Sequence, residues 1–96
     1  MEMFHMIARF EAADGVREEL LLRLKEMERL TQSEPGCIYY ELNVDRDNEN
    51  VFYFREAWES AEDLALHDQT AHVVAIREDE KRFTKDGITV LFMQKP

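Results

Sequence analysis

The sequence contains a single cysteine, Cys37, and no apolar run that approaches the roughly 18 residues of a membrane-spanning helix. One cysteine excludes an internal disulfide and any metal site built from several cysteines. The first six residues, 1–6, have no basic region ahead of a short apolar stretch, so they lack the pattern of a signal peptide. Together these absences predict a soluble cytoplasmic protein.

Positive charge is also scarce, because 12 Lys and Arg residues stand against 21 Asp and Glu residues, for a net charge of −9. The cations are scattered and form no basic stripe. A chain this acidic repels polyanions, so we expect neither nucleic acid nor an anionic membrane as a partner. With 96 residues it is expected to form one domain, residues 1–96, whose small core would gain from a second copy packed against its sheet.

The hydrophobic pattern predicts four strands, over residues 3–12, 37–44, 51–58 and 88–93. In the first strand, alternation places Phe4, Met6, Ala8 and Phe10 on one face. In the second strand, the same alternation places one apolar set together, namely Ile38, Tyr40, Leu42 and Val44.

Two helical regions separate these strands. The first follows Asp14, which we expect to be its N-cap, and it ends before Pro35. Its apolar stripe consists of Val16, Leu20, Leu24 and Met27.

The second helical region begins with a capping-box pattern at Ser60 and Asp63, continues through His67, and restarts at a cap on Thr70. The order strand, helix, strand, strand, helix, strand is that of an α+β, ferredoxin-like βαββαβ fold with an antiparallel sheet.

Three stretches of the chain resemble the antibiotic biosynthesis monooxygenase-like family. They lie within residues 7–15, 33–42 and 56–72, and the last is the most specific because His67 and His72 follow Trp58 by nine and fourteen residues. The resemblance implies a homodimer whose sheets pack into a dimeric α+β barrel, with a pocket in each subunit between sheet and helices. Some members oxygenate aromatic polyketides or quinols without metal, flavin or haem, others degrade haem, and one relative processes a phosphorylated autoinducer sugar.

Oxygenation without a cofactor requires an apolar pocket and a base that titrates near neutrality, because the deprotonated substrate itself reduces oxygen. An imidazole titrates near pH 6.5, so His67 and His72 are the expected catalytic residues. The alternative is that one of them caps a helix end and the other fills a polar gap. Their spacing of five differs from the i, i+4 pair of helical metal sites, so we expect no metal, and the resemblance implies that no organic cofactor is needed.

Several residues are expected to bind the substrate. Trp58 either stacks on a flat substrate or packs in the core, and Glu56 on the same face either pairs with an arginine or orients a histidine ring. Tyr40 is expected to bury its ring while its hydroxyl finds a partner. The remaining wall of the pocket, or equally a plain core, would be formed by Phe4, Met6, Phe52 and Phe54.

Three other residues are expected to lie outside the pocket. His5 and Arg9 fall on the opposite face of the first strand, where the resemblance implies the dimer barrel. Cys37 follows a turn and is expected to be a small buried residue, since nothing near it in sequence would activate a thiolate.

Two departures from the family pattern bear on the reaction. Haem-degrading members carry an Asn and a haem-ligating His where this chain has Ala8 and Arg77, which disfavours haem oxygenation. Polyketide-oxidising members carry an Asn and a Tyr where this chain has Phe54 and Leu64. The substrate of that branch therefore does not transfer directly.

Three hypotheses follow. The first is a cofactor-independent monooxygenase that uses molecular oxygen on a small quinol-like or polyketide-like aromatic. The second is an isomerase or degrading enzyme for a small phosphorylated or hydroxylated carbonyl compound, with Arg55 or Arg77 as the anion-binding cation. The third is a non-enzymatic dimeric ligand-binding protein, which predicts a closed or very small cavity.

Overall fold

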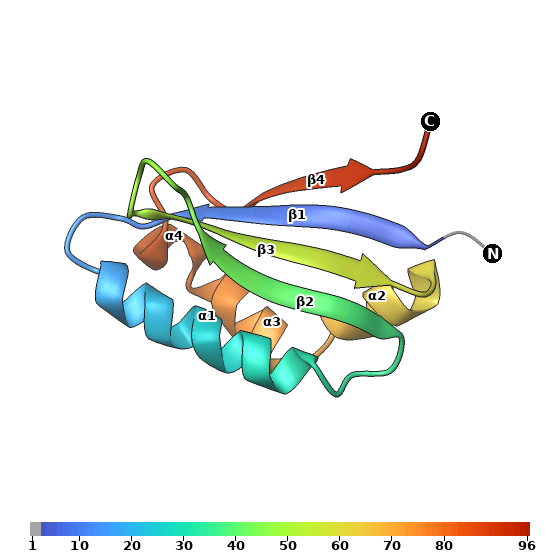
Figure 1. The fold of residues 1–96 in the computed structure, drawn as a ribbon. Coiled ribbons are helices and arrows are strands. Elements are labelled where there is room, and N and C mark those ends of the chain that lie inside the picture. The colour runs from blue at the N-terminus through green and yellow to red at the C-terminus, as the bar shows by residue number, and fades with distance from the viewer. Residues whose placement is uncertain (1–2) are drawn as a thin grey trace.

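The computed structural model describes residues 3–96, and residues 1 and 2 of the N-terminal stretch discussed above lie outside them. One antiparallel sheet carries its helices on a single face (Figure 1). Its strand order is β2-β3-β1-β4, with the bounds β1 Phe4–Glu11, β2 Cys37–Val44, β3 Val51–Trp58 and β4 Thr89–Met93. The helices are α1 Arg17–Thr31, α2 Ala61–Asp68, α3 Ala71–Glu78 and α4 Glu80–Phe83. The predicted α+β ferredoxin-like fold is confirmed.

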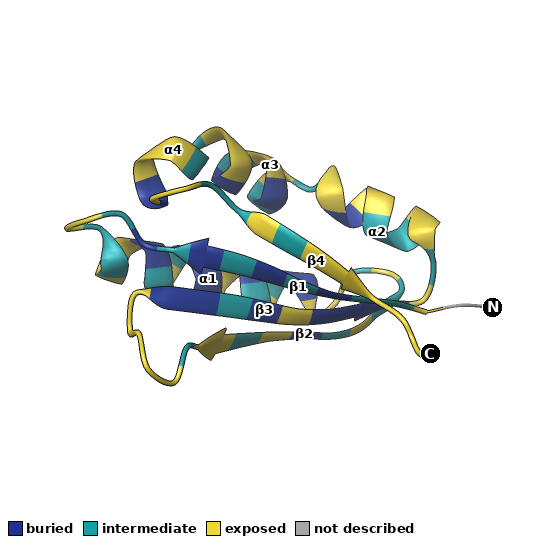
Figure 2. Cartoon of the chain, turned by 90° about the horizontal axis from the view of Figure 1, so that it is seen from above, coloured by how far each residue is buried: buried dark blue, intermediate teal, exposed yellow. Residues whose placement is uncertain are grey.

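The core lies between the sheet and the helices, as the alternation in the central strands predicts (Figure 2). In the register of β1 with β3, Met6 lies opposite Glu56 and Ala8 opposite Phe54, so both strands turn one face toward the helices. The face of α1 that packs onto this layer buries Leu20, Leu24, Met27 and Thr31. Among the described residues, no helix is both long enough and apolar enough to span a bilayer.

Strand β2 departs from the predicted alternation at one residue. The pairing with β3 shifts between Cys37 and Tyr39, so Ile38 is the extra residue of a β-bulge and is 42% exposed rather than buried with Tyr40. Val44, at the other end of the strand, is also exposed. Val44 nevertheless lies opposite Phe52, as Leu42 lies opposite Phe54, so the expected shared face is correct for Tyr40, Leu42 and Val44 and wrong for Ile38.

The outer edge of β2 is occupied by side chains of α1. Glu28 Oε2 accepts a hydrogen bond from the backbone N–H of Leu42 at 2.8 Å, and Gln32 Nε2 donates to the carbonyl of Tyr40 at 2.6 Å. Both backbone groups belong to the edge that faces away from β3, because β2 is the last strand of the sheet on that side.

The helix caps agree only in part with the sequence pattern. Ser60 caps α2, since its Oγ accepts the N–H of Asp63 at 3.1 Å and donates to the Asp63 carboxylate at 2.9 Å. Thr70 precedes α3, but its hydroxyl donates to the carbonyl of His67 at 2.7 Å and so ties α3 to α2.

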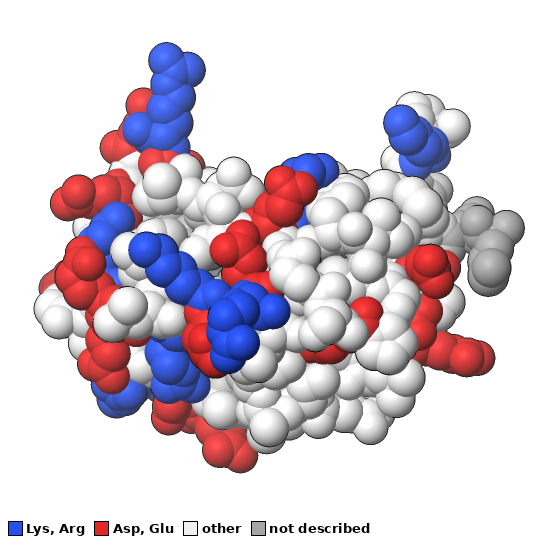
Figure 3. All heavy atoms as spheres, turned by 60° about the horizontal axis from the view of Figure 1, so that its bottom comes forward, with Lys and Arg blue, Asp and Glu red and all other residues white. Residues whose placement is uncertain are grey.

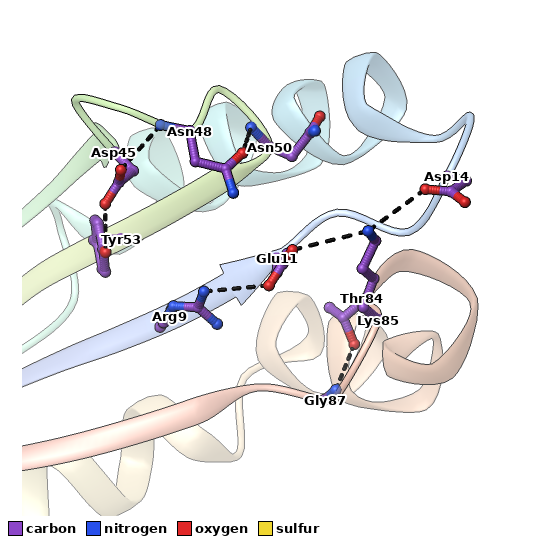
Figure 4. Close-up of polar contacts among 10 residues, drawn as sticks. All are labelled: Arg9, Glu11, Asp14, Asp45, Asn48, Asn50, Tyr53, Thr84, Lys85 and Gly87. Carbon is purple, nitrogen blue, oxygen red and sulfur yellow. Dashed lines mark hydrogen bonds and ion pairs between the residues drawn. The ribbon is translucent and has the colours of Figure 1, made fainter.

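The expected cap at Asp14 is wrong. Helix α1 begins at Arg17, two residues later than a cap at Asp14 requires, because Gly15 adopts a φ of +80° and extends the turn. The Asp14 carboxylate instead lies 3.7 Å from Lys85 Nζ, and Lys85 also approaches Glu11 at 3.9 Å (Figure 4). These contacts join the β1–α1 turn to the segment that leads into β4.

The geometry of the turn after α1 predicts that replacing its glycine with alanine destabilises the fold. Gly36 has a φ of +76°, and a Cβ built there would lie 2.1 Å from Oδ2 and 2.5 Å from Cβ of Asp63. We expect Gly36→Ala to lower the free energy of unfolding by about 3 kcal/mol, from left-handed strain and overpacking together.

Gly15→Ala is the matched control, because its φ is similar and no heavy atom lies within 4 Å of the added Cβ. It should cost only the strain, about 1 kcal/mol. Urea unfolding measures both values, and equal losses in the two variants would contradict the steric role assigned to Gly36.

Candidate functional site

The end of the sheet beside α2 gathers the two histidines that the sequence singled out. Helices α2 and α3 follow one another through a tight connection (Figure 1). His67 lies in the last turn of α2 and His72 in the first turn of α3, and their ring centroids are 6.0 Å apart. Both rings therefore approach the same space at the end of α1. His67 is buried and His72 is mostly buried.

Glu34 occupies that space. It lies in the turn that follows α1, where the backbone is held by hydrogen bonds from Glu34 N to Thr31 O and from Cys37 N to Glu34 O. Its Oε1 lies 2.8 Å from His67 Nδ1 in a hydrogen bond. Because a carboxylate only accepts, the proton of the neutral His67 ring is placed on Nδ1, and Nε2 keeps its lone pair.

The second oxygen of Glu34 lies 2.6 Å from Nε2 of His72. The direction of this contact does not suit a hydrogen bond, and Oε2 is the buried side-chain oxygen that lacks a hydrogen-bond partner among residues 3–96. The hydroxyl of Thr31 lies 3.2 Å from the same nitrogen of His72. One carboxylate thus bridges two imidazoles in a largely buried site.

The aromatic side chains of the sheet fix the His67 ring. Its centroid lies 4.6 Å from that of Trp58 and 5.3 Å from that of Tyr40. Burial lowers the pKa of His67 and outweighs the opposing effect of Glu34, so the neutral ring is favoured. Burial likewise raises the pKa of Tyr40 well above its ordinary value, so Tyr40 stays protonated.

Glu56 is paired differently from either alternative raised by the sequence. Its Oε1 accepts a hydrogen bond from Trp58 Nε1 at 3.1 Å, and the carboxylate that orients His67 is Glu34. Burial raises the pKa of Glu56 to about 7, although the Trp58 hydrogen bond and the charge of Arg77 act in the opposite direction. At neutral pH Glu56 is therefore divided between its protonated and charged forms.

A cavity of about 30 Å³ lies between sheet and helices beside these groups. Four of the expected site residues line it, namely Met6, Tyr40, Glu56 and His67, and Asp68 and Arg77 form its exposed side. This volume holds one water-sized molecule rather than an aromatic ring. His72 does not line it.

The other expected wall residues lie elsewhere. Phe52, Phe54 and Trp58 are buried in the core and do not line the cavity. Phe4 lines a separate open hollow of about 530 Å³ at the end of the sheet, together with Phe92 and Met93.

The contacts of the two candidate arginines show where each of them lies relative to the cavity, and the burial of the cysteine decides its protonation state. Arg55 pairs with Glu41 and lies 4.0 Å from the centroid of the Tyr39 ring, on the sheet face away from the helices, whereas Arg77 lines the cavity. Burial raises the pKa of the Cys37 thiol to about 11, which leaves it protonated and unreactive. Figure 3 shows acidic and basic side chains interspersed over the helical face, with no continuous basic patch in that view.

Sequence reasoning missed Glu34 and Thr31. Glu34 belongs to the stretch 33–42, which carries part of the family resemblance but indicated no role for this carboxylate. The signal that could have identified it is a glutamate at the end of a helix within a segment of family resemblance.

Comparison with known proteins agrees with this architecture. The model of the antibiotic biosynthesis monooxygenase family matches residues 3–79. PA3566 from Pseudomonas aeruginosa has the same fold with a TM-score of 0.92 and 24% identity, over 100% of this chain and 96% of that chain. Rv0793 from Mycobacterium tuberculosis gives a TM-score of 0.91 and 23% identity, over 99% of this chain and 96% of that chain.

A third solved structure, described as an antibiotic biosynthesis monooxygenase, has a TM-score of 0.88 and 25% identity, over 97% of this chain and 98% of that chain. No curated protein matches the chain.

The pKa of Glu56 predicts a pH dependence of stability. The pKa is about 7 in the fold against an ordinary value of 4.5, so between these values the folded chain binds more protons than the unfolded chain. The stabilisation from the protonated carboxyl is therefore complete below pH 4.5 and is lost as the pH rises through 7. Relative to Glu56→Gln, we expect the wild-type protein to lose up to about 3 kcal/mol of unfolding free energy between pH 4 and pH 8.

Urea unfolding of both proteins at the two pH values measures this difference. His67, whose lowered pKa acts in the opposite direction, is present in both proteins and cancels. A difference between the two proteins that does not change with pH would contradict the assignment.

Proposed function

Because the chain belongs to the antibiotic biosynthesis monooxygenase family, we propose that it oxidises a small quinol-like or polyketide-like aromatic with molecular oxygen, without a metal or organic cofactor. The observation that carries this proposal is the hydrogen bond between Glu34 and His67 beside the cavity. It presents a neutral imidazole, oriented by a carboxylate, to the space where a substrate would be deprotonated.

The proposed reaction uses the substrate as its own reductant. Nε2 of His67 accepts the phenolic proton while Glu34 stabilises the imidazolium that forms, and the resulting anion reduces oxygen. For a quinol, one oxygen atom enters the ring and the other leaves as water, so the products are a hydroxyquinone and water. His72, on the other oxygen of Glu34, holds the carboxylate in position.

The cavity must widen to admit the substrate. Its volume of about 30 Å³ suits oxygen or water, and its exposed side is formed by Asp68 and Arg77, whose charged atoms lie 3.9 Å apart. Asp68 ends α2 and Arg77 lies in α3, so we propose that these helices move apart when the aromatic ring binds. Met6, Tyr40 and Glu56 would then contact the ring.

We further propose that residues 1–96 form one domain that acts in the cytoplasm as a homodimer. The helices leave the other face of the sheet uncovered (Figure 1). On that face Leu91 of β4 pairs with Ile7 and is 56% exposed, and His5 and Arg9 lie on the same side of β1. A second copy packed there would bury this surface, as the family resemblance implies.

The small cavity also favours a second candidate function, a dimeric binding protein without turnover. Such a protein needs no space for an aromatic ring beside His67, and a volume of about 30 Å³ agrees with that requirement. Measured turnover separates the two functions.

Oxygen consumption tests the monooxygenase. Metal-stripped protein should consume oxygen on menadiol faster than the spontaneous reaction, and we expect His67→Gln to lower the enzymatic rate by about 100-fold or more, because the base is lost. Catalase separates the two reactions, since spontaneous oxidation to the quinone produces peroxide whereas the proposed reaction produces water.

His5→Asn is the matched control, because His5 bonds the Tyr39 hydroxyl at 3.1 Å on the other face of the sheet, and it should leave turnover unchanged. The absence of wild-type turnover on a panel of quinols and polyketides would favour the binding protein. Wild-type turnover that His67→Gln and His72→Ala leave unaltered would show that the base is another residue.

The dimer makes a separate prediction. Leu91→Lys places a charge at the centre of the proposed interface, so sedimentation velocity should show a monomer where the wild-type protein sediments as a dimer. Leu22→Lys, at a leucine on the solvent side of α1 that is also exposed, is the control and should remain dimeric. A dimer that persists in Leu91→Lys would mean that the copies associate through another surface.

A further inference from the structure

Glu34, His67 and His72 together have the composition of a metal site. One carboxylate oxygen and one ring nitrogen from each histidine lie within 4.8 Å of one another, and all three side chains are largely buried. Two histidines and a glutamate are a ligand set that transition metals such as Zn²⁺ bind in proteins, with further positions left for water. The sequence argument against a metal considered only the two histidines, whose spacing does not predict that the turn after α1 supplies a third ligand.

The distances suit a small ion. A tetrahedral ion with bonds of 2.0–2.2 Å spaces its ligand atoms about 3.4 Å apart. The Glu34–His67 and Glu34–His72 contacts are 2.8 Å and 2.6 Å, so each pair would have to separate by less than ~1 Å, which side-chain rotation provides.

A second observation at the site also points to a cation. Oε2 of Glu34 is buried and has no hydrogen-bond donor, although it lies close to a ring nitrogen. A bound ion would satisfy this oxygen and remove the competition between Glu34 and Thr31 for the same nitrogen of His72.

The surroundings favour a positive ion as well. Asp68 adds negative charge near His67, and the whole chain carries a net charge of −9. The rings of Trp58 and Tyr40 hold His67 in its orientation, and the partial exposure of His72 gives an ion a path from solvent.

We propose that Glu34, His67 and His72 bind one divalent transition-metal ion per chain, with Zn²⁺ as the reference ion. The ion is coordinated by Nδ1 of His67, Nε2 of His72 and the carboxylate of Glu34. Coordination at Nδ1 leaves the proton of the His67 ring on Nε2, so the ring loses the lone pair that would accept a substrate proton. Metal binding therefore switches off the base that the proposed function uses, although the metal site itself does not depend on that function.

Calorimetric titration of chelator-treated, untagged protein with Zn²⁺ tests the site. The wild-type protein should bind one ion per chain, and Glu34→Gln and His72→Asn should each weaken binding by at least about 100-fold. Two controls should bind as the wild-type protein does, namely His5→Asn, a half-buried histidine on the other face of the sheet, and Glu62→Gln, an exposed glutamate on α2. Mg²⁺ and Ca²⁺, which prefer sites built from oxygen ligands, should not compete.

Two further readouts keep the test independent of folding and of catalysis. Co²⁺ should give visible absorption bands of a low-coordinate site in the wild-type protein and not in His72→Asn, whose fold is checked by circular dichroism. Zn²⁺ should raise the melting temperature of the wild-type protein only. The proposal is overturned if the wild-type protein shows no saturable binding below about 1 mM Zn²⁺, or if both ligand variants bind as tightly as the wild-type protein.

Oxygen uptake then separates this site from the proposed function. We expect Zn²⁺ to lower turnover on menadiol in proportion to its occupancy. If the metal-free protein turns over the quinol and binds no metal, only the metal site fails. If a metal bound by Glu34, His67 and His72 raises turnover, the metal site stands and the cofactor-free reaction fails.

Discussion

The carboxylate of Glu34, held between the imidazoles of His67 and His72, is the interaction on which this end of the molecule depends. It lies where α1 ends, next to the negative end of the helix dipole, a position that disfavours a buried anion. The N–H of His67 offsets part of this cost by donating to one carboxylate oxygen, and the ring of His72 lies against the other. The helical layer is therefore joined at one point by polar contacts as well as by apolar packing, with contributions from α2, α3 and the turn after α1.

The fold could be predicted from local sequence patterns because its strands alternate apolar and polar residues. The core faces of the two central strands can be recognised from their own sequences, and Ser60 with Asp63 three residues later marks the start of α2. The sequence predictions fail at residues whose position depends on chain geometry outside their immediate sequence. Asp14 fails as a cap because Gly15 turns the chain first, and Ile38 leaves the core because a bulge in β2 is set by its pairing with β3.

The candidate site was only partly predictable for the same reason. His67 and His72 stand out through their spacing after Trp58, which is a property of one short stretch. Glu34 precedes His67 by 33 residues, in a Pro-Gly turn of the kind that usually lies in solvent, and its burial arises only once α2 and α3 pack over it. The partner of Glu56 is likewise a product of packing, since Trp58 turns its N–H back along the strand.

Glu28 and Gln32 on α1 have a consequence for how copies of this chain meet. A terminal strand normally offers free amides and carbonyls to which a foreign strand can add, the first step of amyloid-like growth. On β2 the amide of Leu42 and the carbonyl of Tyr40 are already satisfied from within the chain, and the bulge at Ile38 interrupts the flat template. Addition of a foreign strand along this edge of the sheet is thereby disfavoured, because the groups that would pair with it are already occupied.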